Sequence, residues 1–184
     1  VFHVEHEYLA VWRRFKRVLK QRNSLLKQGG QANVLDSWDE EFIELARQVD
    51  RIRREVLELA TPILEEQAGA LLGHAVAISY QQGWRAGQEL EAAVAAARGR
   101  DMQLGSSQVG RHRDELWIVA SDRQARRLGW RGMHKLLACA MIMGASDVVQ
   151  TAFGRPLLLL MDDPAAELDK DSLGRIMSGA IGLG

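Results

Sequence analysis

The feature that most constrains the fold is a run of apolar residues that ends in two aspartates. Residues 156–161 read Pro-Leu-Leu-Leu-Leu-Met, and Asp162 and Asp163 follow directly. A continuous apolar run of this length, after a turn signal at residues 154–156, predicts a strand buried on both faces of a parallel sheet. Ligands of such sheets bind outside the carboxyl ends of the strands, which is where the two aspartates would lie.

The adjacent aspartates allow two interpretations. In the simpler one, a buried strand ends in a polar turn. In the other, the pair resembles a Walker B motif, because two neighbouring carboxylates repel each other unless a cation or a hydrogen-bond donor lies nearby. A Mg²⁺ ion would supply that charge, with carboxylate and phosphate oxygens as its ligands.

Composition narrows the class of protein. The chain has 184 residues, which suits one domain or slightly more, and its 24 Lys and Arg residues equal its 24 Asp and Glu residues. The whole chain therefore has no bulk attraction to nucleic acid. Its single cysteine, Cys139, excludes a disulfide within the chain and favours a reducing, cytoplasmic setting. We expect no membrane span and no signal peptide, and a chain that starts at Val1 without Met reads as a piece of something longer.

The first part of the chain predicts a helical hairpin. Apolar residues recur at three- and four-residue steps over residues 5–27 and 38–61, and Gly29 and Gly30 separate the two segments. Asp36 or Ser37 is the expected cap of the second helix. Pro62 is expected to kink that helix or to begin a continuation to residue 72. We therefore expect an antiparallel helical lobe over residues 1–74.

The pattern changes after Gly73, and residues 75–184 predict part of an α/β layer. Strands are expected at 75–80, at 115–120 and in the apolar run. Helices are expected at 89–98, from 131 or 132 to 143, and from about 170, and residues 101–110 are expected to form a polar loop. The predicted fold class is α/β, with the helical lobe added to it.

One segment is strongly basic. Between Trp12 and Gln28 the chain has seven Lys and Arg residues and no acid, and we single out Arg13, Arg14, Arg17 and Lys20. This segment is either a solvated helix face or a surface that contacts nucleic-acid phosphates without sequence preference. Because its aromatic residues fit the apolar stripe, contact with duplex DNA is favoured over stacking on single strands.

Several short motifs, in their order along the chain, resemble the RecF family of bacterial DNA-repair ATPases of the SMC/ABC-type P-loop class. The motifs are Val1–Glu5, Gln21–Leu26, Trp38–Glu41, Gly110–Asp114, Asp162–Asp163 and Glu167–Asp169. The resemblance implies an ATP-binding head with an inserted helical lobe, Mg²⁺ and ATP as cofactors, and an ATP-dependent homodimer. It also implies binding of DNA at gaps or junctions and cooperation with RecO and RecR in loading recombinase.

The resemblance also implies roles for individual residues. Asp162 matches the aspartate that holds Mg²⁺, directly or through water, and Asp163 matches the carboxylate that polarises the attacking water. The remaining matches concern the dimer interface of the ATPase. They are the signature-like segment with Trp130, Arg131, Gly132 and Lys135, and the D-loop with Glu167 and Asp169.

Three departures from the family pattern bear on activity. No G-x-x-x-x-G-K-[ST] sequence occurs in the chain. Arg111 stands in a Gly-Arg-His-Arg sequence where the family has Gly-Pro-His-Arg, and Trp130 occupies the signature serine position. We therefore expect the chain as given not to be a competent ATPase. The alternative is a non-catalytic DNA- or protein-binding helical module with a relic ATPase head; an SMC-like protein would need a far longer coiled coil.

Overall fold

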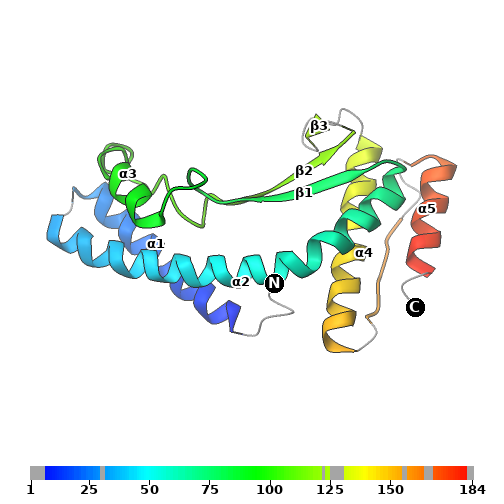
Figure 1. Ribbon diagram of the computed structural model, residues 1–184, viewed down its shortest axis with the longest axis horizontal. Helices are drawn as coiled ribbons and strands as arrows, with labels where there is room; N and C mark the ends of the chain where they lie inside the picture. The colour runs from blue at the N-terminus through cyan, green and yellow to red at the C-terminus, as the bar shows by residue number, and fades with distance from the viewer. Residues whose placement is uncertain are drawn as a thin grey trace. The chain divides into compact units, whose positions relative to one another are not determined.

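The computed structural model describes residues 7–29, 32–121, 123–124, 131–154, 157–163 and 168–181. These residues contain five α-helices and three short strands, shown in Figure 1. In chain order they are α1 (Tyr8–Lys27), α2 (Ala32–Leu72), β1 (Val76–Gln81), α3 (Leu90–Leu104), β2 (Glu115–Ala120), β3 (Arg123–Gln124), α4 (Arg131–Phe153) and α5 (Lys170–Ile181).

The chain divides into two compact units. Unit 1 consists of Val1–Glu55 and Tyr80–Glu115, and unit 2 consists of Val56–Ser79 and Leu116–Gly184. Helix α2 and strands β1 and β2 each contribute residues to both units. This division differs from the predicted lobe at 1–74 and head at 75–184, and that assignment of domains stays a prediction.

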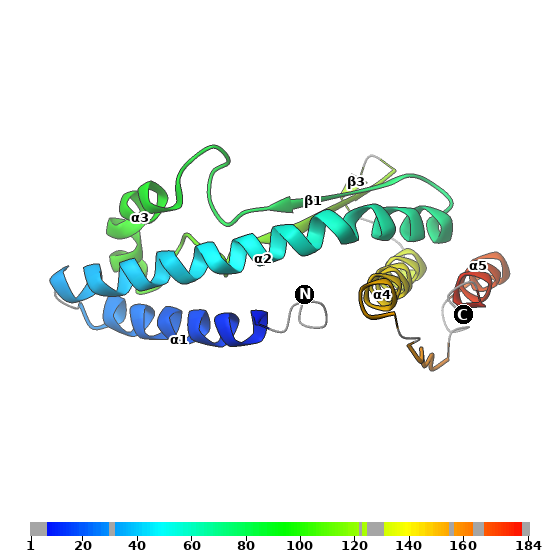
Figure 2. The same ribbon diagram turned by 60° about the horizontal axis from the view of Figure 1, so that its bottom comes forward.

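Unit 1 is built on the hairpin of α1 and the first half of α2, which run antiparallel side by side (Figures 1 and 2). Gly29 makes the turn with a positive φ of 65°. Phe15, Phe42 and Val49 are fully buried between the two helices, and the rings of Phe15 and Phe42 stack 5.3 Å apart. The predicted hairpin is thus confirmed in its two helices, and its apolar stripe is the core of unit 1.

Helix α2 is longer than predicted. It begins at Ala32, so Asp36 and Ser37 lie inside it and do not cap it. Leu35 explains the early start, because its side chain is 2% exposed and its burial favours helix one turn before the polar cap signal. At the other end the helix continues through Pro62, where burial of Ala60 and Leu64 holds the flanking turns.

The strands form one small sheet in the order β1-β2-β3. β2 and β3 are antiparallel, with Val119 opposite Gln124 and Ala120 opposite Arg123. The predicted strands at 75–80 and 115–120 are therefore confirmed.

Helix α3 extends to Leu104, into the predicted polar loop, and ends at Gly105 in the left-handed conformation. The prediction of a loop from residue 101 was wrong because Asp101, a residue that usually favours loops, is 1% exposed and hydrogen-bonded inside unit 1.

In unit 2, helix α4 packs against α5 and against the end of α2. Met143 and Ile176 are buried, and an added Cβ at Gly144 would lie 2.9 Å from Leu64 Cδ2. α4 runs ten residues past its predicted end at 143.

The segment Gly132–Phe153 of α4, with a mean hydropathy of 1.5, is also long and apolar enough for a membrane span, which the sequence analysis did not expect. Buried core helices are often as long and as apolar, but only 28% of this segment is buried within the chain, with Leu136 and Ala140 among its buried residues.

The predicted central strand is not formed in this chain. Residues 157–163 belong to no helix or strand, and Leu158 and Leu160 are 85% and 83% exposed. A buried strand needs a neighbouring strand for its backbone N–H and C=O groups. The described part of the chain places none beside this segment, so the prediction of burial on both faces was wrong here.

Candidate functional site

The aspartate pair lies at the end of the exposed segment in unit 2. Both Asp162 and Asp163 are exposed, and Asp163 has a positive φ of 42°, which is uncommon for a residue other than glycine. The Lys135 Nζ on α4 donates a hydrogen bond of 3.0 Å to the carbonyl oxygen of Asp163. The structure thus brings together one residue of the signature-like segment and one of the acidic pair.

The donor set around this pair suits Mg²⁺ only in part. Among the described residues no group of three or more His, Cys, Asp or Glu side chains could hold a metal ion. Mg²⁺ usually keeps several waters and is held by one or two carboxylates together with substrate phosphates. Asp162 and Asp163 fit that role, but not that of a cage built by the protein alone.

The other residues of the predicted nucleotide site fall in different places. Gly132 is buried in the first turn of α4. Trp130, Glu167 and the side chain of Arg131 lie outside the described residues. Asp169 caps α5: the Ser172 N–H donates to Asp169 Oδ1 at 2.7 Å, and this bond lowers the pKa of Asp169. Asp169 therefore has a structural contact that the sequence analysis did not assign to it.

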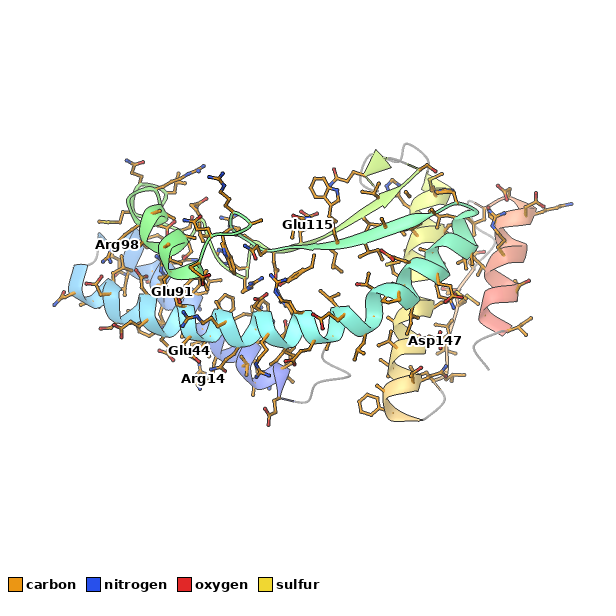
Figure 3. The ribbon with its side chains drawn as sticks, in the orientation of Figure 1. Arg14, Glu44, Glu91, Arg98, Glu115 and Asp147 are labelled. Atoms are coloured by element: carbon orange, nitrogen blue, oxygen red, sulfur yellow. The ribbon has the colours of Figure 1, made fainter. Side chains whose placement is uncertain are left out.

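The predicted DNA-binding residues lie on the outer side of α1. Arg13, Arg14, Arg17 and Lys20 are exposed. Arg14, labelled in Figure 3, forms an ion pair of 3.3 Å with Glu41 on α2. Arg13, Arg17 and Lys20 have no acidic partner within the described part of the chain. Three of the four cations are therefore available to a ligand.

Arg22, in the same basic segment, has a different role. It is completely buried, and its guanidinium donates to Asp39 at 2.6 Å, to Asp101 at 2.7 Å and to Ser107 Oγ at 2.7 Å. Asn23 accepts hydrogen bonds from the N–H and the hydroxyl of Ser107. This Arg22 cluster joins α1, α2, the end of α3 and the loop after it, so two of the short motifs, Gln21–Leu26 and Trp38–Glu41, meet around one buried cation.

Exposed ion pairs reinforce the same contact between α3 and α2. Glu91 and Arg98 project from α3 in Figure 3 and pair with Arg47 and Asp36 respectively. Such exposed pairs contribute little to stability by themselves. The position of α3 against α2 therefore depends mainly on the Arg22 cluster, and the two ion pairs add only a small contribution.

A second polar cluster surrounds the Gly110–Asp114 motif. Asp114 accepts hydrogen bonds from Arg53 and from the hydroxyl of Tyr80. Burial and the contact with Asp114 raise the pKa of Tyr80 to about 12. Arg111 is 1% exposed, pairs with Asp50 at 2.6 Å, and its guanidinium carbon lies 4.0 Å from the centroid of the Trp84 ring. The arginine that replaces the family's proline is thus part of the core of unit 1.

Sequence reasoning missed both clusters, although one signal was present. Phe15, Val18, Arg22 and Leu26 follow each other at the spacing of the apolar stripe of α1. A cation at such a position predicts burial with an acidic partner. The identity of the partners could not be read from the sequence, because Asp101 and Ser107 lie about 80 residues away.

Comparison with known proteins agrees with the resemblance stated from the motifs. No protein-family model matches the chain. The chain is 35% identical over 186 residues to the DNA replication and repair protein RecF of Stenotrophomonas maltophilia, covering 99% of the chain and 51% of that protein. It is 33% identical over 180 residues to RecF of Cellvibrio japonicus, covering 96% of the chain and 49% of that protein.

The chain is similar in sequence to RecF over nearly its whole length.

The fold agrees with this relationship. A solved structure described as the recombination mediator protein RecF with ATP in the RecFOR pathway matches with a TM-score of 0.81 and 21% sequence identity, over 95% of the chain and 50% of that protein. The predicted fold class, part of an α/β layer with added helices, is therefore confirmed. The chain spans about half the length of the RecF proteins it matches.

Proposed function

We propose that the chain supplies the helical lobe and part of the ATP-binding head of a RecF-like DNA replication and repair protein. The support is a sequence identity of 33–35% to RecF proteins over more than nine-tenths of the length of the chain. The proposal extends to a cytoplasmic protein that dimerises with ATP, binds DNA at gaps or junctions and supports recombinase loading with RecO and RecR.

In the complete protein, Asp162 would hold Mg²⁺ and Asp163 would polarise the attacking water. Mg²⁺ would neutralise charge on the phosphates of ATP. Lys135 contributes from this chain by fixing the backbone at Asp163, since its ammonium group holds the carbonyl oxygen of a residue in an uncommon conformation. The chain has no G-x-x-x-x-G-K-[ST] sequence, so the main phosphate cradle would come from another part of the protein.

The observation that carries the DNA-binding part of the proposal is the exposed, unpaired basic side of α1. Cations that lack an acidic partner gain most from meeting phosphates, because they lose no ion pair and release counterions from the DNA. The aromatic rings of this helix, Tyr8, Trp12 and Phe15, pack within unit 1 and offer no base-stacking platform. Binding is therefore expected to be to the backbone and insensitive to sequence.

The test is a duplex-binding titration of the chain at several salt concentrations. Replacing Arg13 and Arg17 with Glu should weaken binding equally for duplexes of different sequence and flatten the dependence of affinity on salt. A double replacement of Arg85 and Arg100 with Glu gives the same change of charge on two exposed arginines outside α1 that form no ion pair among the described residues, and it is the matched control. An unchanged salt slope in the Arg13 and Arg17 variant would place the DNA surface elsewhere.

A second candidate function is the non-catalytic binding module. It is favoured by the organisation of unit 1, whose core and two polar clusters are closed within that unit. A P-loop encoded upstream of Val1 would support the ATPase, and a coding sequence that lacks one would support the module.

A further inference from the structure

A groove along one side of α1 is lined by five polar side chains and one leucine, and none of the five is an acid. Its volume is about 430 Å³, and its walls are Lys16, Leu19, Lys20, Asn23, Ser24 and Lys27. Three of these six side chains are lysines with no acidic partner in the described part of the chain. Only Lys20 belongs to the basic residues singled out from the sequence.

The polar side chains between the lysines also present donors. The backbone N–H of Ser107 can only donate, and it lies 2.8 Å from Asn23 Oδ1, which fixes the orientation of the Asn23 amide. The amide oxygen is thus engaged with Ser107, and the Nδ2 amino group has no protein partner among the described residues. Ser24 Oγ accepts from Gln28 Nε2 at 3.2 Å, so its hydroxyl hydrogen also remains available.

Contacts with the end of α3 and the loop after it fix the side chains of the groove. Ser107 accepts from the buried Arg22 and donates to Asn23, so the Arg22 cluster positions the Asn23 amide. At the end of α3, Gly105 has a φ of 63°, and an added Cβ there would lie 2.9 Å from Lys27 Cγ. The stem of Lys27 therefore rests against the turn that follows α3.

We propose that this groove is the binding site for the phosphate backbone of duplex DNA on the helical lobe. The Asn23 amino group would be a fixed hydrogen-bond donor between the lysines. Lys16 and Lys27 are eleven residues apart, about 16 Å along a helix, which equals roughly five base-pair steps of a duplex. The wall offers no aromatic ring on which a base could stack. The inference rests on the proposed DNA-binding function and specifies which surface of α1 performs it.

The decisive variant is Asn23→Asp. An aspartate can still accept both hydrogen bonds from Ser107, but it replaces the donor that faces the groove with a negatively charged oxygen. We expect the affinity of the 184-residue chain for a 30-base-pair duplex to fall about tenfold, with an unchanged melting temperature. Lys16→Gln and Lys27→Gln should each lower the salt slope by about one, since each removes one phosphate contact.

The matched control is Asn33→Asp. It makes the same change from amide to carboxylate on an exposed residue of α2 that does not line the groove, and its Oδ1 can still accept from the Val34 N–H. It leaves every side chain of the groove unchanged and its charge is screened by salt, so its effect should stay below about threefold. Equal weakening by Asn23→Asp and Asn33→Asp would overturn the proposal, because binding would then depend on diffuse charge alone.

The remaining outcomes separate this inference from the proposed function. If the Lys16, Asn23 and Lys27 variants bind duplex normally while the Arg13 and Arg17 variant does not, the groove is refuted and DNA binding by α1 stands. If the unmodified chain binds no duplex, both fail. If an acidic peptide of polyglutamate binds as tightly as the duplex and competes with it, the groove is a general acceptor of anionic chains and the assignment to DNA is wrong. Should Asn23→Asp lower the melting temperature, the exposed Lys16→Gln and Lys27→Gln decide the question.

Discussion

At the scale of single residues, Arg22 carries the strongest constraint on unit 1. It is a buried cation that forms ion pairs with two buried acids, Asp39 and Asp101. Its side chain is completely buried, so water cannot replace a lost partner. Removing one member of such a group leaves uncompensated charge in a medium of low dielectric constant. The identity of this residue therefore affects stability far more than the exposed arginines on the same helix.

We predict that Arg22→Met lowers the free energy of unfolding by about 3–5 kcal/mol. Urea titration followed by tryptophan fluorescence measures it, since Trp12 and Trp38 pack against the core of unit 1. Arg51→Met, which breaks the exposed pair with Glu55, is the control and should cost less than about 1 kcal/mol. A loss below 1 kcal/mol for Arg22→Met would show that water reaches Asp39 and Asp101 in its place.

His112 gives unit 1 a pH dependence. Burial lowers the pKa of His112 below its ordinary value of 6.5, and the neighbouring Arg113 and Arg22 lower it further, while the bond to the Ser107 carbonyl and Asp101 oppose the shift. The unfolded chain then binds a proton more readily than the folded chain. Stability is full above pH 6.5 and falls as the pH drops through the folded pKa.

The corresponding experiment compares the unfolding midpoint of the chain and of His112→Gln between pH 8 and pH 5. The difference between the two proteins should change in favour of the variant as the pH falls, because glutamine does not titrate. The other histidines are present in both proteins and cancel in the comparison. A difference that is constant with pH would contradict the lowered pKa.

At the scale of elements, Pro62 is the least favourable position of α2. A proline inside a helix lacks the N–H for one hydrogen bond and presses against the carbonyl one turn earlier. Its side chain is exposed, so an alanine there would leave no cavity. We predict that Pro62→Ala raises the free energy of unfolding by about 1–3 kcal/mol, measured by urea titration. A loss of stability would mean that unit 2 packs on a kink that proline maintains.

The elements also show what the sequence could and could not predict. Periodicity predicted the existence of all five helices and of β1 and β2. It misplaced the ends at Asp36 and Asp101, because local signals for caps and loops were outweighed by burial of Leu35 and by the Arg22 cluster. Similarly, the basic segment predicted the exposed side of α1, but the donor groove depends on Ser107, which is distant in sequence and orients Asn23.

At the scale of the whole molecule, a neutral chain carries strongly uneven local charge. Equal numbers of acids and bases conceal that many of the acids of unit 1 are paired with arginines, while the lysines of the α1 groove are not. The net charge therefore predicts nothing about DNA binding. DNA binding depends instead on the cations that have no acidic partner among the described residues.

The exposed segment at residues 157–161 has a consequence for handling the protein in solution. This uncharged stretch belongs to no helix or strand and exposes Leu158 and Leu160, so it offers apolar side chains to any other chain. We predict that the 184-residue chain self-associates at micromolar concentration, and that Leu158→Lys with Leu160→Lys makes it monodisperse. Dynamic light scattering of the two proteins at equal concentration measures this, with Leu59→Lys on the exposed side of α2 as the control. Expression trials should therefore treat colloidal stability, and not folding of the helices, as the first obstacle.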